Sequence, residues 1–171
     1  MNAKHLLRLI EEVERLKLTS REGWKLRGVR EAESVAEHAL GVAFLSMLLA
    51  DEEKLDVEKV IRMALLHDLQ EARVGDISIF SPRYPEKREI EERAIDEALK
   101  HFPGYRKLWG EYVKGKSPEA KSVKQADKLE LLIQALEYER KGYDVGDFWD
   151  EEYEFNGLAR ELYELLKKAR P

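Results

Sequence analysis

Apolar residues recur along most of the chain at the three- and four-residue spacing that places them on one face of an α-helix. Near the N-terminus this spacing predicts an amphipathic helix over residues 6–16. Ser34 followed by Glu37 has the spacing of a capping box, which predicts that a second helix begins there and continues to about Ala50. Apolar residues cover most of the circumference of this second helix, so we expect it to lie at the centre of the fold.

The same period predicts four more helices farther along the chain. Asp56 can cap the first of them, and Ser117-Pro118-Glu119 places a cap, a proline and an acid at the start of the third. We expect Pro103-Gly104 to end the second of these four helices. Stretches with glycine, proline or serine interrupt the period and predict loops. The four helices cover residues 57–66, 90–102, 119–140 and 158–166, and the loops cover residues 21–34, 75–85 and 142–150.

The composition favours a soluble, all-α protein. The chain has 171 residues, of which 43% are apolar and 38% charged, which is enough for a sizeable core without disulfides. No apolar run approaches the roughly 20 residues that span a membrane, and the N-terminal segment is too charged after Ile10 to be a secretory signal. We therefore expect a cytoplasmic protein of one domain, residues 1–171, folded as a single compact bundle of about six to seven helices.

The cysteine content and the net charge exclude several kinds of site. Because the chain has no cysteine, it has no disulfides or thiolate ligands, and any metal must be held by His, Asp or Glu. The net charge of −5 argues against binding to polymeric nucleic acid, which needs a basic surface. A small phosphorylated ligand is compatible with this charge.

The four histidines are the first candidates for chemistry. His5 lies in a charged first turn and His101 lies in a solvated stretch near a helix end, so neither position indicates a function. His38 and His67 each lie within a strongly apolar helix. For either one alone, a neutral core imidazole that is hydrogen-bonded to a neighbour is the simpler interpretation.

The run that begins at His67 changes this interpretation. His67, Asp68, Glu71 and Asp76 place one imidazole and three carboxylates within ten residues, directly after an apolar stretch. Burying an unpaired charge is expensive, so buried carboxylates are paired or bind metal. His67 and Glu71 are four residues apart and are expected on one face of a helix. His67 and Asp68 would point about 100° apart on that helix, so they can share an ion only at their common edge.

Two further residues can complete such a site. His38, in the first turn of the central helix, is a natural second imidazole, and Asp127 lies at the edge of the apolar stripe of a later helix. Taken alone, Asp127 is better explained as a surface partner of Lys124 or Lys128. Two imidazoles and two carboxylates suit Mn, Co, Fe, Ni or Zn better than Ca or Mg. A divalent ion held this way acidifies water, and the remaining carboxylates of the run would be free to take a proton.

A basic segment precedes His38. Arg21, Arg27 and Arg30 surround Trp24 in an otherwise acidic chain. Arginine binds phosphate through two parallel hydrogen bonds, so this segment can place guanidinium groups beside the metal. Equally, the arginines can pair with nearby glutamates while Trp24 packs in the core. The residues alone favour neither interpretation.

Together these motifs resemble those of a known family. The pattern of His38, His67-Asp68 and Asp127 is similar to that of the HD superfamily of metal phosphohydrolases. Within this superfamily the chain most resembles the 5′-deoxynucleotidases of the HD domain-containing protein 2 type, over roughly residues 5 to 165. The matching segments are Arg21–Trp24, Glu33–His38, His67–Asp76, Lys124–Glu130, Gln134–Glu139 and Asp147-Phe148.

The resemblance implies an HD-domain fold and the hydrolysis of deoxynucleoside 5′-monophosphates to the nucleoside and phosphate. The substrate would be a small nucleotide. The residues that the resemblance assigns to the divalent metal are His38, His67, Asp68 and Asp127.

The resemblance also assigns roles around the metal. Glu71 would be the catalytic carboxylate, and Asp76 would help to hold the sugar or a second cation. Arg21 would meet the phosphate, and Trp24 would pack near the sugar and help to select deoxyribose. In some relatives the arginine immediately precedes the tryptophan, whereas a glycine does here, so Arg21 and Arg27 both remain candidates for the phosphate contact.

A homodimer is expected as well, because members of this family often form dimers. Several aromatic residues late in the chain look exposed and would offer a surface for a partner. They would be buried instead if they pack the last helix onto the bundle. These residues are Phe148, Trp149, Tyr153 and Phe155.

Two other functions fit the same residues. An HD-type site can act on a phosphodiester or a nucleoside triphosphate, although a triphosphate should need more basic residues than the chain has near the motif. A helical scaffold can hold a structural metal, with a closed shell of ligands, or no metal. The scaffold hypothesis leaves Glu71 and Asp76 without a role.

Overall fold

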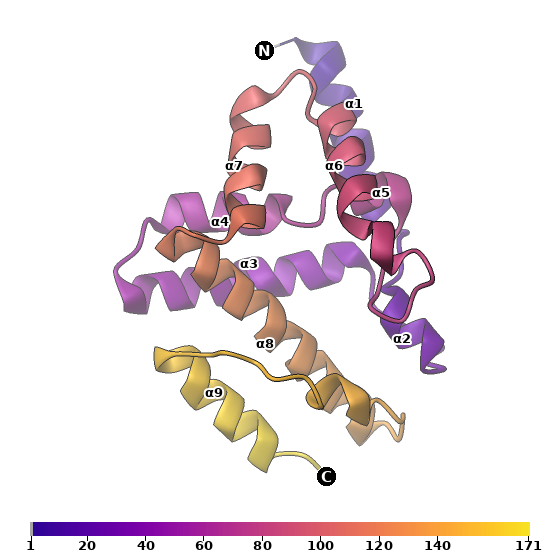
Figure 1. Ribbon diagram of the computed structural model, residues 1–171, viewed down its shortest axis with the longest axis vertical. Coiled ribbons are helices and arrows are strands. Elements are labelled where there is room, and N and C mark those ends of the chain that lie inside the picture. Colours follow the sequence, from indigo (N-terminus) through magenta and orange to yellow (C-terminus); the bar gives the residue numbers. More distant parts are fainter. Residues whose placement is uncertain (1) are drawn as a thin grey trace.

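The computed structural model describes residues 2–171, and α-helices form nearly all of its regular structure (Figure 1). Among these residues no strand forms, and one isolated β-bridge joins Ser20 to Ser34. The all-α fold class predicted from the sequence is confirmed. The helices of ten or more residues are α1 (Ala3–Leu16), α3 (Val35–Glu53), α4 (Val57–Leu66), α6 (Lys87–Ala98), α7 (Pro103–Lys114), α8 (Pro118–Arg140) and α9 (Gly157–Lys168). The shorter elements are α2 (Glu22–Leu26), α5 (Glu71–Val74), and the 3₁₀ turns η1 (Tyr84–Glu86) and η2 (Gly146–Trp149).

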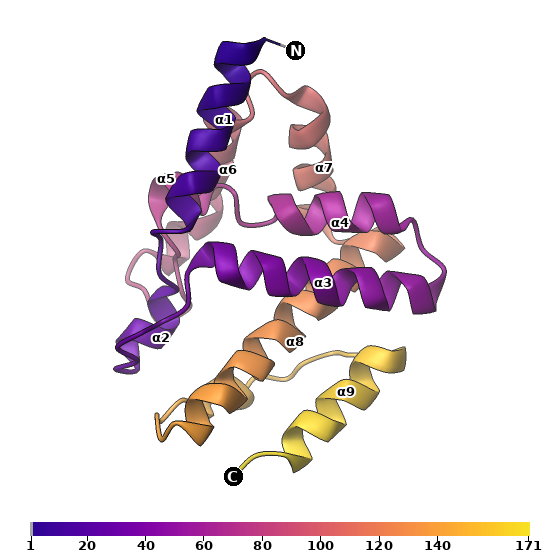
Figure 2. The same cartoon turned by 180° about the vertical axis from the view of Figure 1, so that it is seen from behind.

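A hairpin of α3 and α4 forms the centre of the fold. α8 crosses α3 on one side of this hairpin and carries α9 beside it, while α1, α6 and α7 extend from the other side (Figures 1 and 2). The two termini therefore lie at opposite ends of the molecule. The predicted metal ligands lie near the start of α3, just after α4 and in the middle of α8, so the packing of these three helices brings them together.

The predicted helix starts are confirmed by their caps. The Ser34 hydroxyl accepts a hydrogen bond from the Glu37 amide, and the Glu37 carboxylate accepts one from the Ser34 amide, which completes the capping box of α3. Asp56 caps α4 by accepting from the Lys59 amide at 3.0 Å. Ser117 caps α8, with Pro118 in the first turn. Each cap satisfies an amide that has no partner within its own helix.

The sequence prediction was wrong at Pro103-Gly104. Helix α6 ends earlier, at Ala98, and Pro103 begins α7, a helix that the sequence pattern did not reveal. Proline lacks the N–H that a first turn does not need, so it is as compatible with the start of a helix as with an end. The missed helix matters for function, because Trp109 and Tyr112 of α7 line the cavity beside the predicted metal ligands.

The central helix is less enclosed than its apolar sequence predicts. Val42 and Leu49 are buried, but Leu40 and Phe44 on another face of α3 are 69% and 59% exposed. α3 packs mainly against α4 and α8, and neighbours on two sides leave a third face open. Within residues 2–171, no helix is both long enough and apolar enough to cross a bilayer.

The late aromatic residues do not form the exposed partner surface that was considered from the sequence. Phe148 and Trp149 are each 8% exposed, and Phe155 is 9% exposed. They belong to the same core as α3, α4 and α8, and Tyr153 packs against that core. The segment between α8 and α9 is therefore attached to the bundle by its aromatic side chains, and the predicted homodimer gains no support from them.

Candidate metal centre and adjoining pocket

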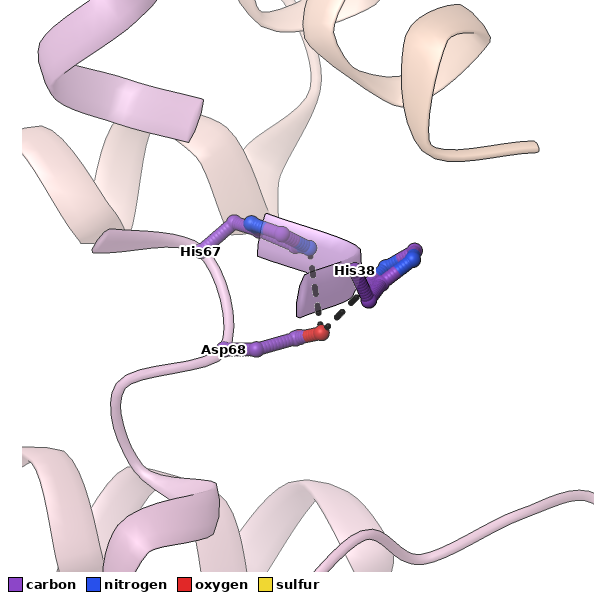
Figure 3. Close-up of side chains that lie close together, drawn as sticks. All are labelled: His38, His67 and Asp68. Carbon is purple, nitrogen blue, oxygen red and sulfur yellow. Dashed lines mark ion pairs between the residues drawn. The ribbon is translucent and has the colours of Figure 1, made fainter. Parts of the chain in front are cut away.

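Two buried imidazoles and an aspartate meet beside the α3–α4 hairpin (Figure 3). His38 lies early in α3, His67 follows the last residue of α4, and Asp68 comes next. One nitrogen or oxygen atom from each of the three lies within 4.8 Å of the others. Asp68 directs Oδ2 at both rings, 3.0 Å from Nε2 of His67 and 3.7 Å from Nε2 of His38. This spacing suits three ligands of one ion.

Asp127 adds a second carboxylate from the middle of α8. Its Oδ1 lies 3.3 Å from Nε2 of His38. Burial acts to raise the pKa of Asp127, but Lys128 and the two imidazoles hold it well below its usual value. Among the described residues no ion pair joins Asp127 to Lys124 or Lys128, so the carboxylate faces the imidazoles.

The two imidazoles are oriented by different partners of Nδ1. His67 shares a hydrogen bond of 2.5 Å with the carbonyl oxygen of Ala64, one turn earlier in α4. His38 shares a very short hydrogen bond with the Glu130 carboxylate of α8. Because both partners accept, Nδ1 of each ring is the donor, and Nε2 is the atom left to face a cation. Burial lowers the pKa of each ring, but the neighbouring carboxylates outweigh it and raise the pKa of His38 to about 9, so a bound cation would displace a proton from Nε2. Nε2 of each ring is buried without a hydrogen-bond partner of suitable geometry among residues 2–171, which fits a pair of metal ligands.

Glu130 is a residue of the site that the sequence analysis missed as a functional group. It reaches His38 because α3 and α8 pack closely at Gly41, where a Cβ atom would lie 2.8 Å from Cγ of Glu130. Glu33 lies beside Glu130 and accepts a 2.8 Å hydrogen bond from Nε1 of Trp24. Burial and the charge of Glu130 raise the pKa of Glu33 to about 7. A carboxylate network therefore links Trp24 to the back of the His38 ring.

The run after His67 does not continue a single helix, contrary to the sequence prediction. α4 ends at Leu66, and the chain makes successive turns through residues 67–70 before α5 begins at Glu71. Amide-to-carbonyl hydrogen bonds three residues apart hold these turns, including Glu71 to Asp68 at 3.0 Å. Adjacent residues diverge by about 100° on a regular helix, yet Oδ2 of Asp68 lies 3.0 Å from Nε2 of His67. His67 and Glu71 nevertheless line one cavity of about 180 Å³.

Glu71 is a buried carboxyl group inside this cavity, which we call the metal cavity. It is 2% exposed, and its Oε2 has no hydrogen-bond partner among the described residues. Burial raises its pKa well above the usual value, and the charges of Asp68 and Asp76 raise it further. A carboxyl group whose pKa is raised in this way can hold a proton that an ordinary carboxylate would release.

The structure separates the two arginines that the sequence left equivalent. Arg21 lies over the metal cavity, with Nη1 3.8 Å from Oδ2 of Asp68 and Nε 3.7 Å from Oδ2 of Asp76. These distances exceed a direct hydrogen bond, so the guanidinium retains donors for an anion. Arg27 instead forms a two-bond ion pair with Asp147 of η2 and lies 4.0 Å over the Phe80 ring. It is not among the residues that line the metal cavity.

A second cavity of about 270 Å³, which we call the Trp24 pocket, adjoins the metal cavity. The two share Arg21, Asp76, Lys87 and Lys128. Trp24 is 1% exposed, and its ring lies 4.2 Å from the ring of Phe148. A Cβ atom on Gly23 would lie 3.1 Å from Phe148, so glycine leaves room for this aromatic wall. The other apolar lining residues are Ile77, Ile79, Tyr84 and Leu131.

Comparison with known families identifies the fold and its chemistry. The sequence model of the HD domain family matches residues 13–164. The chain belongs to the HD domain family. This HD domain brings together the His, Asp and Glu groups that can hold an ion.

Curated relatives of this HD domain carry a specific name. The chain is 38% identical to the human "5′-deoxynucleotidase HDDC2" over 158 residues, which cover 86% of this chain and 76% of that protein. It is 37% identical to the Dictyostelium discoideum protein of the same name, over 77% of this chain and 76% of that protein.

Solved structures of HD-type proteins share the fold. A conserved hypothetical protein from Pyrococcus furiosus superimposes with a TM-score of 0.83 at 38% identity, covering 95% of this chain and 98% of that one. A predicted metal-dependent phosphohydrolase from Magnetospirillum magnetotacticum superimposes with a TM-score of 0.74 at 24% identity, covering 97% of this chain and 94% of that one. The second likeness concerns the fold alone.

Proposed function

We propose that this protein is a metal-dependent phosphomonoesterase that hydrolyses deoxynucleoside 5′-monophosphates to the deoxynucleoside and inorganic phosphate. The observation that carries the proposal is the junction of two cavities, because a cluster of metal-type ligands opens beside a pocket with aromatic and aliphatic walls. Arg21 lies where the two cavities meet. A nucleotide has the same order of parts, with an anionic phosphate at one end and a largely apolar base at the other. The name of the human relative supports the same substrate.

The cation would be held by the two imidazoles and the two carboxylates that face them. Because half of these donors are imidazole nitrogens, we expect Co, Mn, Zn, Ni or Fe rather than Mg or Ca. When bound, a cation of this kind supplies Lewis acidity, which makes water nucleophilic near neutral pH. The proposed ligands are His38, His67, Asp68 and Asp127.

Three side chains of the metal cavity would act on the phosphate and the water. Glu71 would take the proton of the attacking water, because its raised pKa allows it to hold that proton afterwards. Arg21 would bind two phosphate oxygens through parallel N–H groups. Asp76 accepts a 2.7 Å hydrogen bond from the Glu22 amide, so it is fixed in a position to orient Arg21 or the sugar.

Trp24 would form the wall next to the sugar. Its ring is held by Phe148 and by the hydrogen bond to Glu33, so this wall is rigid. A rigid wall without room for a 2′-hydroxyl would favour deoxyribose. Arg27 would stabilise the pocket from outside through its pair with Asp147.

We also infer that the chain folds as one domain, because α3, α4, α8 and α9 contribute to one core. A small nucleotide remains the expected ligand, in place of polymeric nucleic acid. The cytoplasmic location and the homodimer stay predictions.

The test is phosphate release by metal-stripped protein. Deoxy- and ribonucleoside 5′-monophosphates would be offered while Co, Mn, Zn or Mg is restored one at a time, with His67→Ala as the control. We expect release that requires a cation, favours deoxynucleotides and is absent in the control. Tight metal binding without release from any monophosphate would reject the proposed substrate.

A further inference from the structure

The metal cavity opens in two directions, and the proposed function uses only one of them. The Trp24 pocket shares Arg21 with the metal cavity. A separate groove of about 690 Å³ shares Tyr112, Asp127 and Lys128 with the metal cavity. A phosphate monoester carries one organic group, which would occupy the Trp24 pocket. The groove therefore has no part in the reaction proposed above.

The groove runs along α8 towards the N-terminal end of that helix. Its α8 residues extend from Lys121 to Lys128, whereas the Trp24 pocket takes Lys128 and Leu131. The two stretches meet at Lys128, which lines the metal cavity as well. The two cavities thus extend in opposite directions along α8 from the metal cavity.

Three lysines line this groove on one face of the helix. Lys121, Lys124 and Lys128 are three and four residues apart, a spacing that aligns side chains on a helix. With a rise of about 1.5 Å per residue, Lys124 and Lys121 lie roughly 6 Å and 10 Å along the axis from Lys128. Among residues 2–171 no ion pair joins Lys121 or Lys128 to an acid, and the one acid of the groove besides Asp127 is Glu154. Such a row of cations is unexpected in a chain with a net charge of −5.

The opposite wall of the groove is fixed in place. The Gln125 side chain accepts a 2.8 Å hydrogen bond from the Asn156 amide, which joins the segment before α9 to α8. Tyr153 donates a 2.6 Å hydrogen bond to the Phe148 carbonyl and stacks on Phe155. Lys124 lies 5.3 Å over the Tyr112 ring. Lys124 also donates a 3.4 Å hydrogen bond to the Val113 carbonyl. The groove is thus bounded by packed aromatic rings, and Lys124 is held at its edge.

We propose that this groove binds a second phosphate group, joined to the phosphate that occupies the metal cavity. The inference rests on the proposed function only in placing the first phosphate at the metal ligands. Ammonium groups attract phosphate as point charges. The lysine ammonium groups are spaced in a row along α8, as successive phosphates are spaced along a linear polyphosphate. The sequence near His67 has few basic residues for a triphosphate, but the lysines of the groove lie more than fifty positions later in the chain.

The test compares two probes, inorganic orthophosphate and inorganic tripolyphosphate. Their binding to metal-loaded protein would be measured by calorimetry in excess cation, and their inhibition of deoxynucleoside monophosphate hydrolysis would be measured in parallel. We expect tripolyphosphate to bind about tenfold more tightly than orthophosphate. In the Lys121→Gln/Lys124→Gln double variant most of this advantage should disappear, a loss of about tenfold for two partly exposed charge contacts. The KM and kcat for the monophosphate should not change.

A matched control distinguishes the effect of the groove lysines on binding from the effect of the protein's net charge. Lys100→Gln/Lys168→Gln removes the same charge from two exposed lysines that lie outside the groove, and it should leave the preference for tripolyphosphate intact. Equal affinity for the two probes, or equal losses in both double variants, would overturn the proposal. Calorimetry does not depend on turnover, so lysine-dependent binding without phosphate release would reject the proposed function and keep the groove.

Deoxynucleoside 5′-triphosphate then identifies the source of the second phosphate. If the Lys121→Gln/Lys124→Gln variant weakens its binding as it weakens that of tripolyphosphate, the groove accepts the tail of a nucleotide. If only tripolyphosphate is affected, the groove accepts free polyphosphate. Both results support a subsite for a second phosphate, and an unchanged affinity for both ligands overturns it.

Discussion

The two sides of the metal cavity are built in different ways. On the α4–α5 side the polar groups come from one continuous run, His67 to Asp76, and the His67 ring is oriented by a backbone carbonyl. On the α3–α8 side His38 is oriented by the Glu130 side chain, 92 positions away in sequence. The two sides therefore differ in whether the group that orients the histidine can be replaced by mutation. A backbone carbonyl cannot be removed by substitution, whereas the Glu130 carboxylate can be changed while every proposed ligand remains.

The largest effect is expected from removing a ligand on the α4–α5 side. His67→Ala should abolish both metal binding and phosphate release, because the carbonyl of Ala64 cannot substitute for the lost imidazole. Metal content after desalting and phosphate release would be measured together. His101→Ala removes a histidine that stacks on His5 and should change neither quantity. A His67→Ala protein that still holds one metal per chain would contradict the ligand assignment.

Glu71 offers the next largest effect, on turnover alone. Glu71→Gln keeps the shape of the side chain but cannot take a proton, so kcat should fall by about 10² to 10⁴-fold. Metal content should stay at the wild-type level, since Glu71 is not among the proposed ligands. Full activity in this variant would show that another group accepts the proton.

A substitution of Glu130 tests the α3–α8 side of the metal cavity directly. Glu130→Gln leaves an acceptor for Nδ1 of His38 but removes its charge, so metal affinity should weaken by about 10- to 100-fold. The affinity would be measured by competition with a chelator. Glu137→Gln on the same helix alters an exposed carboxylate that pairs with Arg140, and it serves as the matched control. Equal affinity in the Glu130 and Glu137 variants would mean that Glu130 only fills space.

The smallest effect is expected at the far end of the same network. Trp24→Phe removes the hydrogen bond to Glu33 and shortens the wall beside the expected sugar site. The preference for deoxyribose over ribose, taken as a ratio of kcat/KM values, should fall by less than about tenfold. The thermal unfolding midpoint of the variant would show that the core remains folded. An unchanged ratio would place sugar selection on other residues.

The sequence could predict the α4–α5 side because its residues are neighbours in the chain. A single run of ten residues contains an imidazole and three carboxylates after an apolar stretch, and these groups line one cavity. The helix caps at Ser34, Asp56 and Ser117 were equally local signals, and all three are present. Local signals failed at Pro103, because proline fits both the start and the end of a helix.

The α3–α8 side could be predicted only in part, because its contacts join distant segments. Nothing near Glu130 indicates that it meets His38, since their approach depends on how two helices cross. Arg21 and Arg27 looked equivalent for the same reason. The partner that draws Arg27 away from the metal cavity is Asp147, 120 positions later. The sequence pattern offered His38 as a second imidazole, but Asp127 taken alone was better explained as a surface partner of a lysine, and resemblance to a family supplied its role as a ligand.

Gly41 limits the ways in which this protein can become more stable. Glycine inside a helix is less stable than alanine by about 0.5–1 kcal/mol, and replacing it by alanine stabilises many proteins where a methyl group has room. Here the new methyl group would meet Glu130 Cγ at 2.8 Å and push the carboxylate away from His38. A stronger central helix and a well-oriented ligand are therefore competing demands on one position. The usual route of stabilising a helix by replacing its glycine is therefore closed at position 41, because the methyl group has no room beside Glu130.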